Sequence, residues 1–379
     1  MRIHKLAAGN RRRIVVLGAI LATGLVATFA ATTARGTGAG PKTVADGLAD
    51  AKKVEAAAQK RPTSITVKTP IGKAIPKNKK IVYVACGAIQ ACTVHIKFLQ
   101  DAAKALGWKA SMITTDGSPQ QVQAAFESAI RSGANGIIST GITRANLEKQ
   151  IGDAKSKGIA FATCCTLASP SNGIIYTTST VKQNAKIGQY LAAKAVADSG
   201  AKGGAVYVNL PAYQILAGVG TDFEKYYKQW CPSCDYGSID IALTDLGKGV
   251  TDKIVSYVRA HPSTNYVVLS EMDALAPGLS GALNAAGLGG KVKIIGQGPG
   301  LAEYQEIRAG TIAGGVPFDF ATIDWMMMDS LARKFANAKV QLTAPPLWLV
   351  TKQNVPNTTG IFPIVSSYKT QFLKLWGKK

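Results

Sequence analysis

Short apolar runs alternate with amphipathic stretches along the chain from residue 80 onward. The apolar runs predict strands at 81–85, 110–114, 136–139, 159–163, 205–209, 239–243, 266–269 and 292–295. Helical spacing of apolar residues predicts helices at 94–106, 119–132, 143–157, 181–197, 215–229, 249–260 and 275–286. This alternation predicts an α/β fold of doubly wound parallel sheets with helices on both faces.

The first 78 residues depart from this pattern. Residues 1–34 join a basic head, which contains Arg11, Arg12 and Arg13, to an uncharged stretch, and this order predicts a secretory signal peptide. The alternative is an uncleaved membrane anchor, because the uncharged stretch is long enough to span a bilayer. Residues 35–78 predict a linker rich in Pro and Lys, with one helix over 43–61 that Pro62 ends.

The chain carries a formal net charge of +22, which raises the question of a nucleic-acid partner. Residues 1–80 hold 16 Lys and Arg against 3 Asp and Glu, so most of the excess lies in the predicted signal and linker. The remaining residues show no basic block interleaved with aromatic residues. We therefore expect no nucleic-acid partner.

Parallel α/β sheets bind ligands at the carboxyl ends of their strands, so the loops after the predicted strands are where functional residues are expected. These loops lack the phosphate-loop spacing, and the chain has no G-x-S-x-G motif. The histidines, His4, His95 and His261, form no pattern with a nucleophile. We expect neither an enzyme nor a cofactor.

Six segments carry a family resemblance in their order and spacing: 79–108, 121–141, 157–165, 202–227, 267–287 and 291–320. They resemble the periplasmic sugar-binding proteins of ABC importers, in the ribose-type branch of the type I fold, over about residues 79–355. The resemblance implies two lobes joined by a three-crossing hinge near Thr178, Pro317 and Pro345. The N-terminal lobe would comprise 79–178 plus 319–344, and the C-terminal lobe 179–318 plus 345–379. Contacts of a ligand with both lobes would favour the closed state.

The chain departs from this family where sugar ligands are held. Family members bind sugar hydroxyls with an Asp-Arg pair, a further Arg, an Asn-Asp pair and a further Asp. The corresponding positions here read 164–166 (Cys-Cys-Thr), 217–219 (Ala-Gly-Val), 272–273 (Met-Asp) and 297–299 (Gln-Gly-Pro), so only Asp273 remains of the charged groups. A pocket of this low polarity suits a modified sugar or a rather apolar solute. The alternative is that the register is off by one or two residues and that polar groups enter from elsewhere.

The candidate ligand-binding residues all lie in or beside the loops that follow the predicted strands. They are Gln90, Cys92, Thr93, Cys164, Cys165, Thr166, Tyr213, Gln214, Met272, Asp273, Gln297 and Phe318, with Glu271 and Asp319 as further candidates. For Tyr213 and Phe318 the alternative is core packing.

Six cysteines in an exported protein predict disulfides. Cys231 and Cys234 are expected to form a local disulfide, because they follow a helix rather than begin one. The other four, Cys86, Cys92, Cys164 and Cys165, fall on two loops that the resemblance places at the cleft, and their three possible pairings stay open. A thiolate metal site is the alternative, but we expect no metal.

Together these features predict an extracytoplasmic solute-binding protein, in the periplasm, cell envelope or medium. Its partners would be a small-molecule ligand and an ABC permease/ATPase complex, and we expect it to act as a monomer close to the membrane. The alternatives are a ligand-sensing module for a membrane sensor and a protein that handles thiols or metals.

Overall fold

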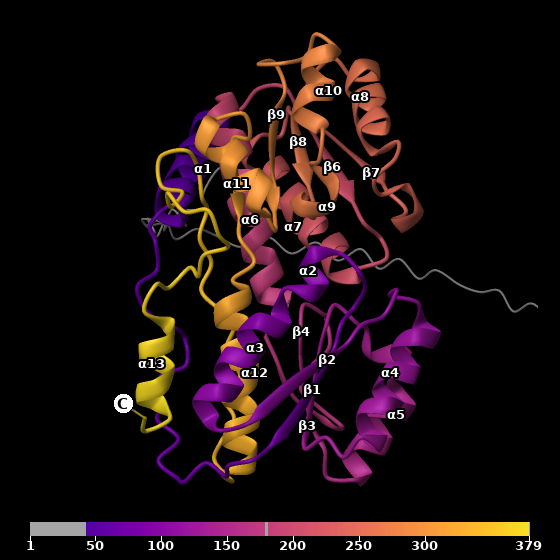
Figure 1. Ribbon diagram of the computed structural model, residues 1–379. Helices are drawn as coiled ribbons and strands as arrows, with labels where there is room; N and C mark the ends of the chain where they lie inside the picture. The colour runs from indigo at the N-terminus through magenta and orange to yellow at the C-terminus, as the bar shows by residue number, and fades with distance from the viewer. Residues whose placement is uncertain (1–42, 179–180, 379) are drawn as a thin grey trace, which may run out of the picture. The chain divides into compact units, whose positions relative to one another are not determined.

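The computed structural model describes residues 43–178 and 181–378 (Figure 1). The predicted signal peptide at 1–34 and the first residues of the predicted linker lie outside the described residues. None of the helices in the described residues is long and apolar enough to cross a membrane. Ten strands form two five-stranded parallel sheets, which confirms the predicted α/β fold with two parallel-sheet lobes.

The first sheet has the strand order β2-β1-β3-β4-β5. Its strands are β1 (Lys80–Val84), β2 (Lys109–Ile113), β3 (Gly136–Thr140), β4 (Ala160–Cys164) and β5 (Ile174–Thr177). Its helices are α2 (Gln90–Thr93), α3 (His95–Leu106), α4 (Pro119–Arg131), α5 (Glu148–Ser156) and α12 (Phe320–Phe335), with a 3₁₀ turn η1 at Arg144–Asn146. Helices α3 and α12 pack together on one face, and α4 and α5 cover the other. The central strands are buried on both faces, as their continuous apolar runs require.

The second sheet repeats the same connectivity, with the order β10-β9-β8-β6-β7. Its strands are β6 (Gly204–Asn209), β7 (Asp235–Asp240), β8 (Thr264–Leu269), β9 (Lys293–Gln297) and β10 (Gly314–Val316). Helices α6 (Val181–Ser199) and α7 (Gln214–Trp230) cover one face; α8 (Val250–Ala260), α9 (Met272–Leu275), α10 (Leu279–Ala285) and α11 (Leu301–Ala309) cover the other. In each sheet the second strand of the chain lies on one side of the first strand and the later strands lie on the other side. The topological switch points therefore lie between β1 and β3 and between β6 and β8.

Several predicted elements differ from the structure. The strand predicted at 239–243 is wrong, because β7 ends at Asp240 and Leu243 begins an exposed 3₁₀ turn, η2 (Leu243–Asp245). β7 is an edge strand without buried residues, so its sequence lacks the apolar run by which other strands were predicted. The short strands β5 and β10 were not predicted. The helix predicted at 275–286 is broken into α9 and α10 at Pro277 and Gly278, where Gly278 adopts a φ of 77°.

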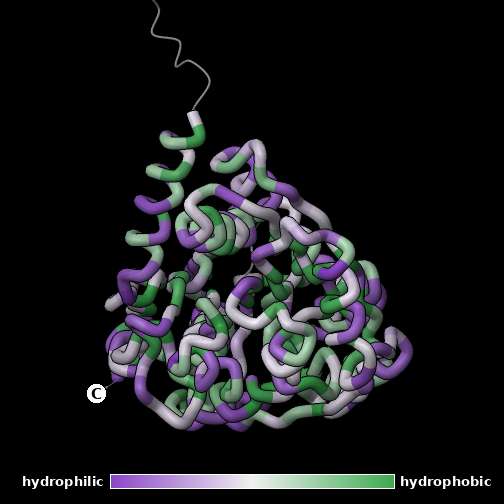
Figure 2. The backbone as a smooth tube through the Cα atoms, turned by 90° about the horizontal axis from the view of Figure 1, so that it is seen from above, coloured by the Kyte–Doolittle hydropathy of each residue, from purple (hydrophilic) through white to green (hydrophobic). Residues whose placement is uncertain are grey.

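The segment predicted as a linker with one helix over 43–61 does contain that helix. Helix α1 (Val44–Ala58) begins at a capping box formed by Thr43 and Asp46 and packs against α6. A Cβ atom on Gly47 would lie 2.4 Å from the Trp230 carbonyl oxygen, so the helix touches the end of α7. Figure 2 shows α1 with hydrophobic and hydrophilic positions in alternation, as expected of a helix with one buried face.

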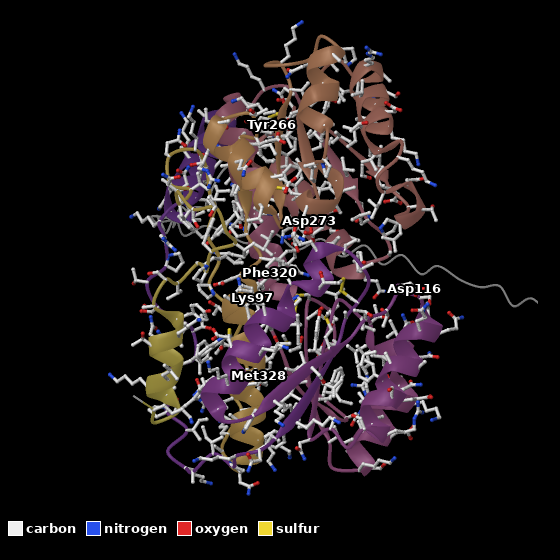
Figure 3. The ribbon with its side chains drawn as sticks, viewed as in Figure 1. Lys97, Asp116, Tyr266, Asp273, Phe320 and Met328 are labelled. Atoms are coloured by element: carbon white, nitrogen blue, oxygen red, sulfur yellow. A yellow bond between two sulfur atoms is a disulfide. The ribbon has the colours of Figure 1, made fainter. Side chains whose placement is uncertain are left out.

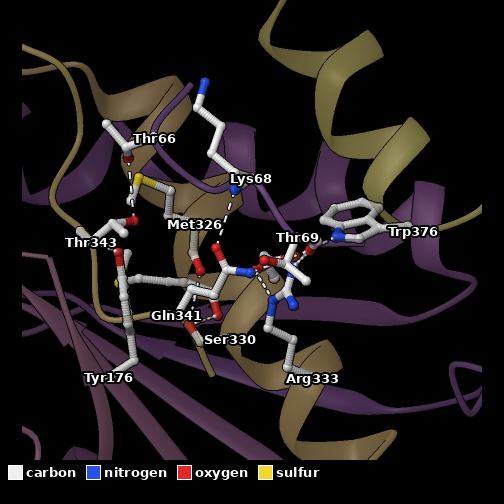
Figure 4. Close-up of polar contacts among 12 residues, drawn as sticks. Thr66, Lys68, Thr69, Tyr176, Met326, Ser330, Arg333, Gln341, Thr343 and Trp376 are labelled. Atoms are coloured by element: carbon white, nitrogen blue, oxygen red, sulfur yellow. Dashed lines mark hydrogen bonds and ion pairs between the residues drawn. The ribbon is translucent and has the colours of Figure 1, made fainter. Parts of the chain in front are cut away.

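Residues 59–79 then run as a strap from the second lobe to β1 of the first. The Thr66 hydroxyl donates to Ala344 O (2.8 Å), Gln341 Oε1 accepts from Lys68 N (3.1 Å), and the Arg333 guanidinium donates to Thr69 O (2.6 Å) (Figure 4). The strap therefore adds a connection between the lobes to the three predicted crossings.

The C-terminal segment also returns to the first lobe, although the sequence assigned 345–379 to the second. Val350 forms an antiparallel bridge with Gly315 in the second lobe, but α13 (Tyr368–Leu375) packs against α12. There the Trp376 ring stacks on Trp325 at 5.1 Å, and its Nε1 donates to Asp329 Oδ1 (2.9 Å). Nothing in the apolar pattern of α13 says which lobe its buried face covers.

Candidate functional site

A cavity of ≈ 50 Å³ lies between the two lobes, at the switch points of both sheets. From the first lobe it is lined by the loops after β1, β3 and β4, through Cys86, Ile89, Ala91, Cys92, Thr140, Gly141 and Cys165, and by His95 of α3. From the second lobe it is lined by Tyr213, Ile215, Leu216 and Glu271, and from the crossing at 317–320 by Phe318 and Phe320. Most of this lining is apolar, as the loss of charged sugar ligands from the sequence suggests.

Tyr213 reaches across the cleft from the loop after β6. A Cβ atom on Gly87 would lie 3.7 Å from the Tyr213 hydroxyl, and one on Gly141 would lie 3.8 Å from its ring. The half-buried tyrosine therefore contacts the glycine backbone after β1 and β3 of the opposite lobe. This contact exists only while the lobes are together.

Two disulfides of the first lobe contribute cysteines to the lining of the cavity. Cys86 pairs with Cys92 within the loop after β1, and Cys164 pairs with its neighbour Cys165 after β4. This is one of the three pairings that the sequence left open. Cys165 adopts a φ of 59°, a conformation that residues with side chains seldom adopt. The third disulfide, Cys231–Cys234, lies between α7 and β7, away from the cavity.

Two acids of the second lobe, Glu271 and Asp273, lie beside the loop after β1 of the first lobe. The carboxyl of Glu271 is buried, with an exposed fraction of 5%, and lies beside Asp273 on the next helix, α9. Burial raises the pKa of Glu271 well above its usual range, and the nearby Asp273 raises this pKa further. Asp273 Oδ2 accepts a hydrogen bond from Ala91 N (3.2 Å), and Figure 3 shows Asp273 where α9 faces α2. The two lobes are thus joined by a charge-assisted hydrogen bond.

His95 is a member of the site that the sequence did not indicate. Its Nδ1 lies 2.7 Å from Asp324 Oδ1, with both side chains buried, and its ring packs edge-on against Phe320 at 5.1 Å. Burial raises the pKa of Asp324 to about 6. The only sequence signal was a histidine one turn into a helix, and its partner lies 229 positions away in the chain.

A second, smaller cavity of ≈ 20 Å³ lies on the hinge side and shares Cys165, Ile215 and Phe318 with the first. Three polar atoms without hydrogen-bond partners belong to its lining, and they are Asn184 Nδ2, Gln297 Oε1 and Asp319 Oδ2. All three side chains are buried to 2% exposure. Buried polar atoms are normally paired, so these atoms point to a ligand or to water.

The structure brings together only part of the predicted site. Cys92, Cys165, Tyr213 and Phe318 line the first cavity, Gln297 lines the second, and Asp273 bridges the lobes. Gln90 is exposed, and its Oε1 lies 3.3 Å from a Cβ position on Gly300 of the opposite lobe. The other predicted residues do not line either cavity: Thr93, Cys164, Thr166, Gln214 and Met272.

Local contacts hold three of these five side chains. Thr93 donates back to its own helix turn at Ile89 O, and Thr166 caps the next turn by accepting from Ala168 N. Met272 is fully buried in the core of the second lobe. In the described residues no three His, Cys, Asp or Glu side chains are arranged to hold a metal ion.

Comparison with protein-family models finds one match, to the periplasmic binding protein domain, over residues 92–339. No curated protein sequence matches the chain. Many solved structures do match it, with sequence identities below 25%, and these likenesses concern the fold.

Three of these structures are instructive. The 5-methylthioribose transporter solute-binding protein from Thermotoga lettingae, in complex with 5-methylthioribose, has a TM-score of 0.66 at 18% identity and covers 82% of this chain and 96% of its own. An ABC transporter solute-binding protein from Agrobacterium vitis with bound allitol has a TM-score of 0.65 at 18% identity, over 74% and 97%. A chain of the XylFII–LytSN complex has a TM-score of 0.62 at 18% identity, over 74% and 100%.

Proposed function

Because the chain belongs to the periplasmic binding protein domain family, we propose that it is an extracytoplasmic receptor of an ABC importer that closes on a small organic ligand and delivers it to a permease. Members of this family bind solutes and are not enzymes, so the chain is a binding protein. We propose that its ligand is a modified sugar or a rather apolar solute. Two of the similar solved structures hold ligands of these general kinds, 5-methylthioribose, which is a modified sugar, and the sugar alcohol allitol.

The observation that carries this proposal is that both lobes contribute to one cavity. Tyr213 and Asp273 of the second lobe contact the loop after β1 of the first, and both contacts are lost if the lobes separate. At ≈ 50 Å³ the cavity is small for a whole solute, so we propose that the ligand enters while the lobes are further apart. Ligand contacts on both sides then stabilise the closed state over the open one.

The test is a thermal-shift screen of the purified protein against sugars, polyols, amines, alicyclic alcohols and aromatic acids, followed by titration calorimetry. The compound that raises the melting temperature should bind at least tenfold more weakly to the Tyr213→Ala variant. Tyr226→Ala is the matched control, because Tyr226 lies on α7 with its ring on Trp230. Equal loss in both variants, or none in either, would contradict the proposed site.

The second candidate function is a receptor module that reports to a membrane sensor. The similar chain in the XylFII–LytSN complex supports it, because that chain assembles with a second protein. Deleting the gene distinguishes the two functions. An importer receptor predicts loss of uptake of the stabilising compound, whereas a sensor module predicts normal uptake and a lost transcriptional response.

A further inference from the structure

The charged side chains that line the two cavities are nearly all of one sign. Among the described residues in this lining, the acids are Glu271 and Asp319, there is no Lys or Arg, and His95 is paired with Asp324. A site for an anionic ligand needs compensating positive charge, and this lining offers none beyond that paired imidazole. The lining therefore disfavours carboxylates and phosphates.

Glu271 is a buried acid that no cation compensates. The groups that act on its carboxyl are Asp273 of α9, which shares a hydrogen bond with it, and Glu303 of α11, and it in turn acts on Tyr207 of β6 and on Tyr213. None of these groups is a cation. Its Oε1 is buried without a hydrogen-bond partner. Burial and the two neighbouring acids raise the pKa of Glu271 well above its usual range, which favours the protonated carboxyl, and a positive charge beside it would favour the carboxylate.

The unpartnered atoms of the lining are mostly acceptors. Glu271 Oε1, Gln297 Oε1 and Asp319 Oδ2 accept hydrogen bonds, and only Asn184 Nδ2 donates. A ligand that satisfies them must supply more donors than acceptors. An ammonium group is such a donor, and it also neutralises the buried charge.

Aromatic rings lie beside Glu271. A Cβ atom on Gly298 would lie 2.0 Å from Glu271 Oε1 and 2.9 Å from Phe318 Cδ2, so the carboxyl and the ring edge are close neighbours. The ring of Phe320 follows Phe318 at 5.9 Å, and Tyr213 lines the same cavity, where burial and the nearby Glu271 raise its pKa. Ring faces attract organic cations, most strongly where water is excluded.

We propose that the ligand is a small organic cation whose ammonium group lies between the Glu271 carboxylate and the rings of Tyr213 and Phe318. This inference rests on the proposed function, because it names the ligand class of the same cleft. The cavity of ≈ 50 Å³ that these side chains line is where the ammonium head group would lie. The acceptors on the hinge side are available to amine or hydroxyl groups on the rest of the ligand.

Three compounds with one ring and different charges test the proposal directly: cyclohexylamine, cyclohexanol and cyclohexanecarboxylic acid. Calorimetry at pH 8, where an alkylamine is protonated, should show that cyclohexylamine binds at least tenfold more tightly than cyclohexanol. Binding of the carboxylate should be absent. Equal or tighter binding of cyclohexanol, or no binding of cyclohexylamine, overturns the inference.

Two variants assign the effect to Glu271. Glu271→Gln keeps the shape of the side chain and should weaken cyclohexylamine binding at least tenfold. Asp153→Asn on α5, whose carboxylate pairs with Lys149 at the surface, should leave it unchanged. A melting curve of each variant separates loss of binding from loss of folding.

The pH dependence provides an independent readout, because cyclohexylamine stays protonated between pH 5 and pH 9. Binding requires Glu271 to release its proton, so the affinity for cyclohexylamine should rise between pH 5 and pH 9, and this rise should be largely lost in Glu271→Gln. The same rise in both proteins contradicts the assignment. Closure of the lobes on a neutral sugar with no response to cations would overturn this inference but would leave the proposed function standing. Failure of every compound class in the wider screen would contradict both proposals.

Discussion

Asp319 is a buried acid whose charge costs stability, and its replacement by Asn should stabilise the protein. Its Oδ1 accepts from Thr322 N (3.2 Å) and caps α12, while its Oδ2 has no partner and the side chain is 2% exposed. Burial raises the pKa of Asp319 from 3.8 to about 6. The folded state therefore favours the protonated acid. This contribution to stability is fully present below pH 3.8 and is lost as the pH rises through about 6.

The magnitude follows from the size of the pKa change. At about 1.4 kcal/mol per unit, a rise from 3.8 to about 6 corresponds to a cost of about 3 kcal/mol above pH 7. Asp319→Asn removes the charge and keeps the oxygen that caps α12. We expect the variant to be more stable than the wild type by about 3 kcal/mol at pH 8 and by less than about 1 kcal/mol at pH 4.5.

Urea unfolding followed by tryptophan fluorescence at pH 4.5, 6 and 8 measures this difference. Asp153→Asn is the surface control, and its stability should differ from the wild type by no more than about 0.5 kcal/mol at each pH. An Asp319→Asn variant that is less stable than the wild type at pH 8, or a difference that does not change with pH, would refute the reasoning. Either result would mean that Oδ2 has a partner that stabilises its charge.

Two further predictions concern the segments that wrap around the lobes. Trp376→Ala should destabilise the protein by about 3–5 kcal/mol in urea unfolding, because it empties the site that stacks on Trp325 and removes the donor to Asp329 Oδ1, while Arg333 still donates to Oδ2; an effect below about 1 kcal/mol would mean that α13 does not pack on α12 in solution. Gly47→Ala should release α1, because its Cβ would lie 2.4 Å from the Trp230 carbonyl oxygen; limited proteolysis should then cleave within 43–61 at least tenfold faster than in the wild type, and equal rates would contradict the packing of α1.

Most of the fold could be predicted from the sequence because the buried parallel strands are continuous apolar runs. β3 and β4 are buried at every position, and their predicted bounds lie within one residue of the structure. β7 could not be found this way, because an edge strand needs no apolar run. The strap at 59–79 was also missed, because its hydrogen bonds are made by backbone and polar groups to residues about 270 positions away.

The sequence could predict those residues of the candidate site that follow the carboxyl ends of strands, but not those that lie within helices. Tyr213, Glu271 and Gln297 lie at or just after the carboxyl ends of β6, β8 and β9, and each lines a cavity. His95 and Asn184 lie within helices, and which face of a helix meets the cleft depends on packing that a single sequence does not reveal. For the same reason the sequence could not show that Thr93 and Gln214, which lie beside residues that line or border the first cavity, line neither cavity.

Small-angle X-ray scattering tests the central claim most directly, because it reports the separation of the lobes. The protein is measured alone and with a saturating amount of the compound that gives the largest thermal shift. The account predicts that the ligand lowers the radius of gyration, and that the Tyr213→Ala variant needs at least tenfold more ligand to reach the same value. A tightly bound ligand that leaves the radius of gyration of the wild type unchanged would contradict closure of the two lobes around it.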